Sequence, residues 1–332
     1  MRTPKFWSPG KGGAQANLLE PVAWGYSMLG QMQRATITPR WVSVPVICVG
    51  NLIAGGAGKT PTALALAKLL SEWGAAPHFL TRGYGGSESG PLRIDGKQHN
   101  ARMVGDEPLL LARRAPTWLA HNRPAGAKAA IADGANVIVM DDGLQNPSLV
   151  KDISLIVIDG GFGFGNGRLI PAGPLREPIA RGLARAEAVV LVGPDEVGVV
   201  DQLKRYDVAL LRAEIAPALK AHKLRGRAVV AFAGIGRPAK FFRTLEAVGC
   251  EVIGRVAFPD HHRYSPDEIM NLVENAGAKG AIAVTTEKDW VRLPQEAKPM
   301  VQPVAVSLVW QDPEAVREIM APALANIAVA ND

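Results

Sequence analysis

One short stretch constrains the fold of this chain more than any other. Residues 50–62 read GNLIAGGAGKTPT, between the apolar run VICV and a segment with helical spacing, ALALAKLLSEWG. A phosphate-binding loop needs a strand that delivers the chain, glycines that let backbone N–H groups turn inward, and a lysine and a hydroxyl where a helix begins. All of these parts occur here, so the sequence predicts a phosphate-binding loop.

The loop departs from the strict pattern G-x-x-x-x-G-K-[ST] at one position, because Ile53 stands where the first glycine is expected. The part nearest the phosphates, GGAGKT, is intact. We expect Lys59 to reach the β and γ phosphates of a nucleotide and Thr60 to bind Mg²⁺. The predicted nucleotide-binding residues are Ile53, Ala54, Gly55, Gly56, Ala57, Gly58, Lys59 and Thr60. A glycine turn without a ligand would not require Lys-Thr followed by a helix.

A second motif, VIVMDDGLQ, places Asp141 and Asp142 at the end of an apolar run. Open α/β sheets bind ligands beyond the carboxyl ends of their strands. One of these carboxylates is expected to hold Mg²⁺, directly or through water, and both stay candidates. Asp-Asp-Gly is also ordinary turn chemistry, but the pairing with Lys59 and Thr60 favours the metal.

The remaining apolar runs predict the fold class. PHFLTR, NVIVMDD, SLIVIDG and AVVLVG are continuous rather than alternating, as in parallel strands buried on both faces, and helical patterns separate them. We expect a P-loop NTPase-like α/β domain with a doubly wound, mostly parallel sheet over residues 41–222. After a helix-like stretch at 201–223, a smaller α/β lobe is expected at residues 223–332. Its last apolar run, 304–310, is compatible with a return towards the first domain.

Composition excludes several classes of protein. The 332 residues are 48% hydrophobic and 20% charged, which is typical of a globular chain. Two cysteines are too few for a disulfide framework or a cysteine zinc site. The net charge of +6 favours an anionic partner, but aromatic RNA-binding signatures and zinc-finger spacings are missing, so no nucleic acid is expected. We predict no membrane span, no secretory signal and no obligate protein partner.

Residues 1–40 are predicted to associate with a membrane. Within 17–34, NLLEPVAWGYSMLGQMQR, one helical stripe is apolar and the opposite side is polar, with tryptophan and tyrosine added. Basic residues on either side suit an anionic bilayer surface. The stripe consists of Leu18, Val22, Leu29 and Met32, and the basic residues are Arg2, Lys5, Lys11, Arg34 and Arg40. Taken alone, this stretch favours the alternative, a helix that packs its apolar stripe on the domain behind it.

Two further motifs concentrate polar groups, VGDEP at 104–108 and FPDHHRY at 258–264. Adjacent histidines rarely share one metal ion, so a metal would need ligands from elsewhere. A carboxylate held by a histidine makes a base for a hydroxyl group instead. From the residues alone, His261 and His262 are equal candidates.

Taken in order, the motifs GNLIAGGAGKTP, TRGYGG, GDEP, DDGLQ, LIPAGPLREP, FAGIGRP, FPDHHRY and TTEKDWVRL resemble those of the tetraacyldisaccharide 4'-kinase family of the lipid A pathway. They extend from residue 50 to residue 293, and the N-terminal segment is similar as well. The resemblance implies transfer of the γ-phosphoryl group of ATP to the 4'-hydroxyl of tetraacyldisaccharide 1-phosphate. It also implies a peripheral enzyme on the cytoplasmic face of the inner membrane.

The same resemblance assigns roles to residues. Asp106 would accept the hydroxyl proton, paired with His261 in preference to His262, while Asp141 and Asp142 would serve Mg²⁺. Residues near the substrate or the nucleotide would be Arg82, Tyr84, Gln145 and Glu177. The segment TTEKD, at 285–289, would border the nucleotide or form an exposed turn. Because the proposed pair is far apart in the chain, the two lobes must close on each other.

A membrane-associated P-loop ATPase of the partitioning type is the main alternative. Its loop carries an extra lysine before the paired glycines, where this chain has Ala54. A nucleotide-gated binding module without chemistry is a third alternative, and it would leave the predicted pairing of Asp106 with a histidine unexplained.

Overall fold

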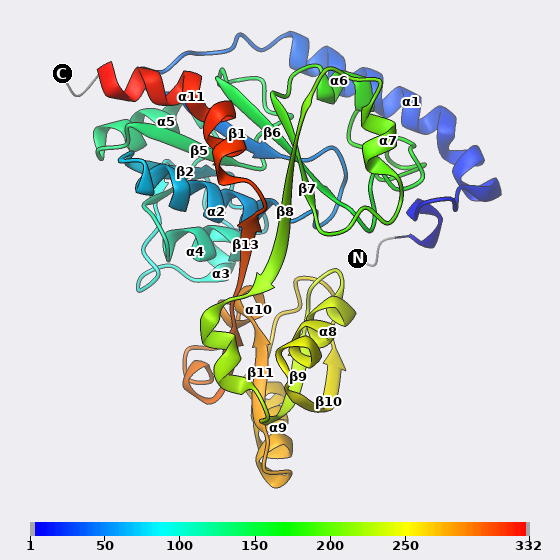
Figure 1. Cartoon of the computed structure of the whole chain (residues 1–332), viewed down its shortest axis with the longest axis vertical. Coiled ribbons are helices and arrows are strands. Elements are labelled where there is room, and N and C mark those ends of the chain that lie inside the picture. Colours follow the sequence, from blue (N-terminus) through cyan, green and yellow to red (C-terminus); the bar gives the residue numbers. More distant parts are fainter. Residues whose placement is uncertain (1–3, 330–332) are drawn as a thin grey trace.

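A nine-stranded sheet forms the centre of the larger domain in the computed structural model, which describes residues 4–329 (Figure 1). The order is β13 (Val306–Trp310), β8 (Ala209–Pro217), β7 (Ala188–Val192), β6 (Ile153–Asp159), β1 (Val46–Gly50), β5 (Val137–Asp141), β2 (Pro77–Thr81), β4 (Thr117–Leu119) and β3 (Leu92–Arg93). The inner strands run parallel, and the two edge strands, β13 and β3, run antiparallel to their neighbours. The predicted doubly wound, mostly parallel sheet is confirmed.

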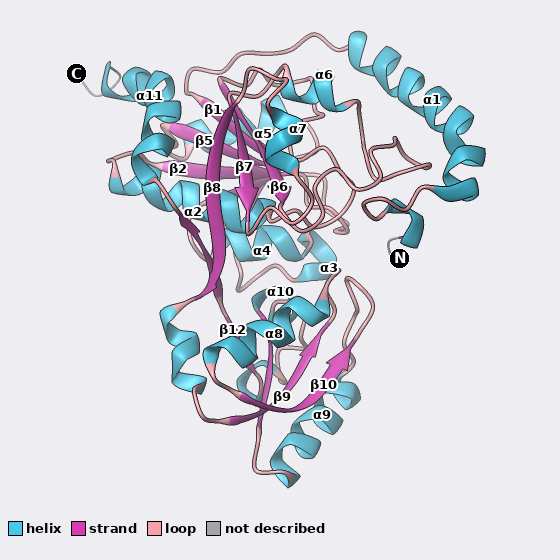
Figure 2. Ribbon diagram, turned by 45° about the vertical axis from the view of Figure 1, so that its right-hand side comes forward, coloured by secondary structure: helices cyan, strands magenta, loops and turns pink. Residues whose placement is uncertain are grey.

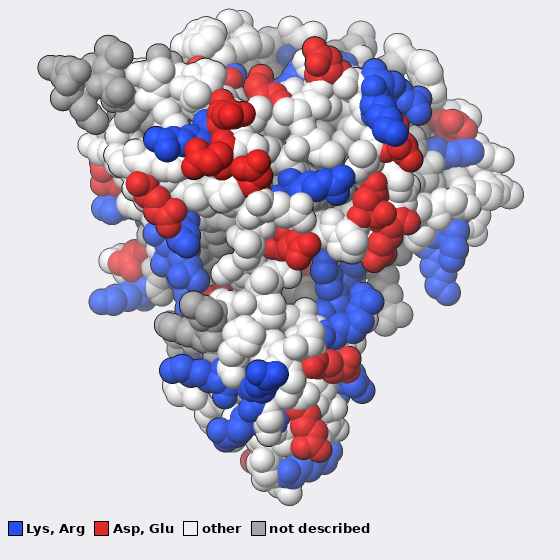
Figure 3. Space-filling model, in the orientation of Figure 1, with Lys and Arg blue, Asp and Glu red and all other residues white. Residues whose placement is uncertain are grey.

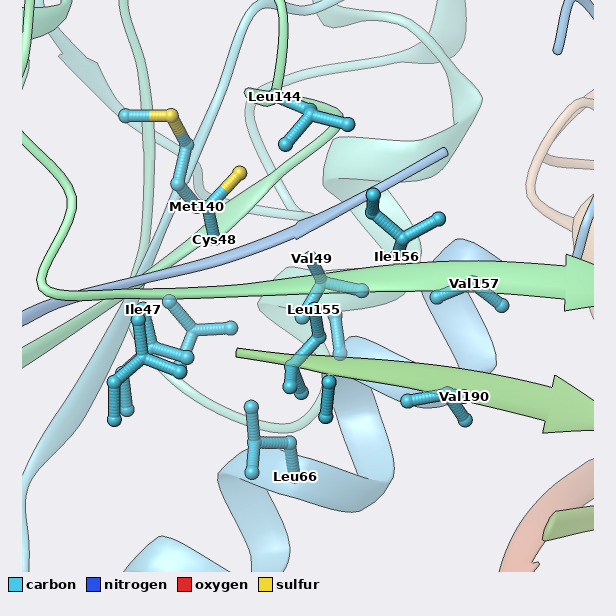
Figure 4. Packing of buried hydrophobic residues seen from close by; sticks show 14 of the residues in the cluster. Ile47, Cys48, Val49, Leu66, Met140, Leu144, Leu155, Ile156, Val157 and Val190 are labelled. Atoms are coloured by element: carbon cyan, nitrogen blue, oxygen red, sulfur yellow. The ribbon is translucent and has the colours of Figure 1, made fainter. Parts of the chain in front are cut away.

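The core of this domain is built around β1. All five of its residues are buried, and it pairs in parallel with β5 on one side and β6 on the other. Figure 4 shows its side chains between those of the neighbouring strands and α2 (Lys59–Glu72). Each aliphatic side chain buried in this way stabilises the fold by about 1.5–3 kcal/mol. The strand that leads into the glycine loop is therefore fixed by β5 and β6 within the sheet and by α2 on one face.

Short helices connect the strands of the large domain. They are α3 (Ala101–Val104), α4 (Asp106–Ala112), α5 (Arg123–Ala132), α6 (Ile179–Leu183) and α7 (Val199–Leu203), with the longer α11 (Pro313–Val329) at the end of the described chain. α2 ends where the sequence predicted, because Gly74 adopts φ +88°, a left-handed conformation that glycine tolerates best.

The smaller domain has its own parallel sheet, in the order β10 (Glu251–Ala257), β9 (Ala228–Ala233), β11 (Ile282–Thr286) and β12 (Gln302–Val304). Its helices are α8 (Pro238–Val248), α9 (Pro266–Ala278) and α10 (Glu287–Trp290), with the 3₁₀ turns η2 (Leu219–Leu224) and η3 (Lys298–Met300). In Figure 2, β9 and β10 point towards the large domain. The loops after these strands therefore face the large domain.

Two expectations from the sequence differ from the structure: where the small domain ends, and the secondary structure of residues 201–223. The chain returns to the large domain at β13, which pairs with β8 and contacts α2, and the buried Val316 and Met320 of α11 join the large core. The small domain thus ends near residue 304 rather than at residue 332. The stretch 201–223 is not helical throughout, because it contains β8, whose exposed Arg212 and Glu214 alternate with buried neighbours.

A long helix, α1 (Gly13–Ala35), lies along the outside of the large domain, at the end away from the small domain (Figure 1). Among the side chains of α1 that the structure describes, the buried ones are small: Ala16, Ala23 and Ser27. The large apolar side chains point outward, with 81% of Leu18 and 66% of Met32 exposed. Leu18, Val22 and Met32 of the apolar stripe therefore do not pack on the domain. The side chain of Leu29 and all of residues 1–3, including Arg2, lie outside the described part.

Within residues 4–329, we find no helix that combines the length and the apolar character needed to cross a membrane.

Candidate active site

The glycine loop lies between β1 and α2, as predicted. Gly55 and Gly58 adopt φ values of +127° and +95°, which side chains other than hydrogen rarely permit. The amide of Asn51 donates to the Gly55 carbonyl at 3.3 Å, and the Thr62 hydroxyl donates to the Gly58 carbonyl at 2.8 Å. Lys59 and Thr60 are the first two residues of α2, whose first N–H groups have no partner within the helix. The loop thus has the geometry of an anion site.

Ile53 and Ala54 anchor the start of the loop. Ile53 is 5% exposed and forms a β-bridge with Leu175, and the backbone N–H of Ala54 donates to the Pro174 carbonyl at 2.7 Å. The glycine missing at residue 53 is therefore replaced by a side chain that packs in the core. The Ala54 N–H is already used, so we expect the backbone donors for phosphate to begin at Gly55.

Asp141 and Asp142 lie in opposite electrostatic environments. Asp141 is 1% exposed; its Oδ2 lies 3.5 Å from the Thr60 hydroxyl, and its Oδ1 has no hydrogen-bond partner among the described residues. Burial, with the nearby charges of Glu107 and Asp142, raises the pKa of Asp141 to about 7. A buried carboxylate with one unpartnered oxygen, and with its other oxygen beside a threonine hydroxyl, fits a bound Mg²⁺.

Asp142 is committed to protein cations. Its carboxylate accepts from Arg176 Nη1 at 2.8 Å and lies 3.7 Å from Lys59 Nζ. Burial alone would raise the pKa of Asp142, but Lys59 and Arg176 outweigh it and lower that pKa. Asp142 also holds a positive φ of 51°. Sequence analysis did not single out Arg176, although the motif LIPAGPLREP contains it.

The predicted carboxylate–histidine pair is present across the two domains. His261 Nδ1 lies 3.1 Å from Asp106 Oδ2, and Asp106 is 5% exposed at the start of α4. His262 instead contacts Glu268 at 3.1 Å and stacks on Phe258. The structure therefore pairs His261, and not its neighbour, with Asp106.

Two further cations reach Asp106 from the small domain. Arg292 Nε lies 3.1 Å from Asp106 Oδ2 and Lys288 Nζ lies 3.9 Å from the same oxygen. Burial opposes ionisation, but the hydrogen bond to His261 and these two charges hold the pKa of Asp106 well below its usual range. Lys288 also contacts Glu107 at 3.3 Å. The segment 285–289 is thus no exposed turn, because it packs against GDEP.

The four predicted substrate residues do not form one cluster. Tyr84 is 73% exposed and its ring centroid lies 6.3 Å from that of His261, so it borders the pair. A Cβ at Gly105 would lie 2.6 Å from the Tyr84 carbonyl oxygen, which explains the glycine of GDEP. Arg82 is exposed.

Gln145 and Glu177 lie behind the glycine loop instead. The Gln145 amide donates to the Asn51 carbonyl at 2.9 Å and to Glu177 at 3.1 Å. Glu177 is 1% exposed and also accepts from Arg185 at 2.7 Å. Their contacts therefore support the loop from within the large domain.

A second ionic contact joins the domains at the end of β6. Asp159 Oδ2 lies 3.2 Å from Arg237 Nη1 and 3.7 Å from Lys240 Nζ, both at the start of α8. Figure 3 shows basic side chains gathered where α8 meets the large domain, with acidic side chains next to them. Arg237 belongs to the motif FAGIGRP and Asp159 to the run SLIVIDG, but the sequence did not predict that they meet.

A glycine loop of this kind binds a nucleotide, and a carboxylate held by a histidine can take the proton of an acceptor hydroxyl. The fold and the site together define a P-loop kinase. Comparison with known families makes the class specific. The model of the tetraacyldisaccharide-1-P 4'-kinase family matches residues 15–325, and the chain belongs to this family.

Individual relatives agree with the family. The chain is 50% identical to the tetraacyldisaccharide 4'-kinase of Rhodospirillum centenum, over 98% of both sequences. It is 51% identical to that of a Methylobacterium strain, also over 98% of both. Among solved structures, the fold resembles LpxK from Aquifex aeolicus in complex with ATP, with a TM-score of 0.72, 24% identity, and coverage of 93% of this chain and 99% of that one. The family expected from the motifs is confirmed, and the partitioning ATPase is not favoured.

Proposed function

We propose that this chain transfers the γ-phosphoryl group of ATP to the 4'-hydroxyl of tetraacyldisaccharide 1-phosphate, which yields lipid IVA in lipid A biosynthesis. Membership of the kinase family supports the reaction. The observation that carries the proposal at the level of residues is the contact between Asp106 and His261, at 3.1 Å, which the two domains make together. ATP as the nucleotide is supported by the Aquifex aeolicus relative, which was solved in complex with it.

On this proposal, the large domain holds the nucleotide. Backbone N–H groups from Gly55 onward and Lys59 contact the phosphates, and Thr60 and Asp141 hold Mg²⁺. When bound, the ion neutralises charge on the phosphate oxygens. Asp142 keeps Lys59 in place through their contact at 3.7 Å and has no free role at the metal. The different partners of the two carboxylates support Asp141, rather than Asp142, as the one that faces the ion.

Asp106 accepts the proton of the acceptor hydroxyl, and His261 orients it. Its low pKa keeps the carboxylate ionised at neutral pH, although it makes Asp106 a weak base. A weak base suffices, because the transferred phosphoryl group passes through a loose transition state that asks mainly for alignment and charge neutralisation. The exposed Tyr84 beside His261 would border the sugar.

The lipid substrate accounts for the outward apolar face of α1. We propose that α1 lies in the anionic cytoplasmic surface of the inner membrane, so that the enzyme is peripheral. The exposed Trp24 and Met28, 66% and 55% accessible, support this placement. A cavity of about 300 Å³ lies between α1 and the following domain. Trp24, Leu175 and Ile179 give it apolar walls that could take part of an acyl chain, and the ion pair of Glu20 with Arg168 gives it a charged wall as well.

The test is a phosphoryl-transfer assay with ATP, Mg²⁺ and the tetraacylated acceptor. ADP release that depends on the acceptor, with a phosphorylated lipid product, would support the proposal, whereas hydrolysis indifferent to lipid would reject it. Asp106→Asn should leave ATP binding nearly intact and cut transfer by about 10²- to 10⁴-fold. Asp201→Asn, in a largely exposed pair with Lys204, is the matched control and should keep full activity.

A further inference from the structure

Arg292 occupies a central place in the small domain. It follows α10 and its side chain is 6% exposed. Its Nη1 donates to the carbonyls of Gly234 at 3.0 Å and His262 at 3.3 Å, and its Nε donates to the carbonyl of Lys288 at 3.1 Å. These carbonyls belong to the segments that follow β9, β10 and β11. One guanidinium group thus ties together all three of these segments.

A fully buried carboxylate fixes this guanidinium group. Asp289 is 0% exposed and lies 3.4 Å from Arg292 Nη1. The same carboxylate accepts from the Gly234 N–H at 2.9 Å, the Tyr264 hydroxyl at 2.7 Å and the Thr286 hydroxyl at 2.6 Å. With so many fixed partners, Asp289 can hold Arg292 in one orientation. The charge of Arg292 is therefore balanced within the small domain itself.

The Nε edge of Arg292 also reaches the large domain. This nitrogen lies 3.1 Å from Asp106 Oδ2, the same oxygen that His261 contacts at 3.1 Å, while Asp106 Oδ1 accepts from the Glu107 N–H at 3.1 Å. We propose that Arg292, held by Asp289, is a positioning residue that orients the Asp106 carboxylate once the two domains are in contact. This inference rests on the proposed role of Asp106 as the proton acceptor.

The chemistry of arginine is required for this role. The single Nε–H of Arg292 already donates to the Lys288 carbonyl, so the contact with Asp106 is an ion pair with the charged edge of the group. A planar guanidinium group can donate to several fixed carbonyls and still set its charge against a carboxylate in a fixed plane, whereas a lysine ammonium is a flexible point charge. Removing the cation would leave the buried Asp106 charge with fewer partners, which is costly in a site of low polarity. His261 and Lys288 remain, so the carboxylate would keep some charge compensation but lose its fixed direction.

The first experiment compares Arg292→Gln, Arg292→Lys and the control Arg255→Gln in the complete enzyme, with ATP, Mg²⁺ and lipid acceptor. Arg255 lies on the same domain, 52% exposed, in an ion pair with Glu246. Arg292→Gln should lower kcat by about 10²-fold, as misalignment of a reacting group does. The KM for ATP should change by less than about twofold, because the large domain binds the phosphates. Arg292→Lys should lie in between, and Arg255→Gln should match the wild type.

The second experiment separates positioning from a merely structural role. Thermal stability and kcat are measured for Asp106→Asn, Arg292→Gln and the double variant. If Arg292 acts through Asp106, Arg292→Gln should lower kcat and thermal stability much less in the Asp106→Asn variant than in the wild type. Additive losses, or wild-type kcat in Arg292→Gln, would overturn the inference. Full activity of Asp106→Asn would instead reject the proposed proton acceptor, and Arg292 would then have no base to position.

Discussion

Asp141 and Asp142 show how far neighbouring residues of one type can differ. Both follow the same apolar run, and the sequence could not rank them. Burial and the charges of Glu107 and Asp142 raise the pKa of Asp141, whereas Lys59 and Arg176 lower that of Asp142. The partner that decides this, Arg176, lies 34 residues further along the chain. The sequence could therefore predict that an aspartate at this position binds the metal, but not which of the two it is.

The raised pKa of Asp141 leads to a prediction about stability. The pKa is about 7 in the folded protein against an ordinary 3.8, so the folded state binds more protons between these values. Without Mg²⁺, stability should therefore fall as pH rises from about 4 to about 7. Asp141→Asn should remove this slope, and saturating Mg²⁺ should reduce it. Melting temperatures measured in chelator across this range provide the check.

The test is the difference in melting temperature between the wild type and Asp141→Asn at each pH, because other groups also titrate in this range. Burial lowers the pKa of His78, which makes stability fall as pH drops below about 6.5, the opposite slope in the same range. Asp106, with its depressed pKa, contributes only at more acidic pH. Parallel curves for the wild type and Asp141→Asn would contradict the account of Asp141.

At the scale of elements, the hydrophobic pattern predicted strands correctly where a strand is buried on both faces. β1, β5, β6 and β7 are fully buried, and their continuous apolar runs predicted them correctly. β8 was missed because Arg212 and Glu214 are exposed in its middle, which resembles the polar face of a helix. The stripe of α1 was found, but only tertiary structure reveals that its small residues are the buried ones.

Exposure of the α1 side chains predicts that affinity for membranes and stability of the fold can be separated. Replacing Leu18 and Met32 by serine should weaken binding to anionic vesicles by at least about tenfold, since burying each such side chain is worth about 1.5–3 kcal/mol. The melting temperature in detergent should hardly change. Vesicle sedimentation and thermal unfolding measure the two quantities.

Ala23 provides the contrasting variant, because it is 2% exposed on the inner side of the same helix. Ala23→Leu should lower stability by about 1–3 kcal/mol through overpacking. Unchanged vesicle binding by Leu18→Ser/Met32→Ser would show that α1 does not hold the protein on the bilayer.

At the scale of the molecule, several ionic contacts join the domains, among them the pair of Arg113 with Glu287, and two of them concern the site. One involves Asp106, and the other is the contact of Asp159 with Arg237 and Lys240. The partners at the first place, His261 and Asp106, are 155 residues apart. Motif order implied that such residues must meet, but nothing local in the sequence could show that α8 would meet the end of β6.

Asp159→Asn should loosen the second contact without touching the first. Arg237 and Lys240 are 42% and 44% exposed, so the pair contributes about 0.2–1 kcal/mol and its loss should reduce kcat by up to about fivefold. The effect should shrink at high salt, since such pairs are screened. Steady-state kinetics at two ionic strengths measure it, and a loss as large as that of Asp106→Asn would indicate a direct role in transfer instead.

The return of the chain through β13 has a consequence for the order of folding during synthesis. Residues 218–304 form one uninterrupted segment with its own parallel sheet, so this part can fold as soon as it leaves the ribosome. The nine-stranded sheet must wait for Val306–Trp310, which supply its last edge strand and a surface for α2. We therefore expect the nascent large domain to stay open along β8 until Val306–Trp310 have emerged.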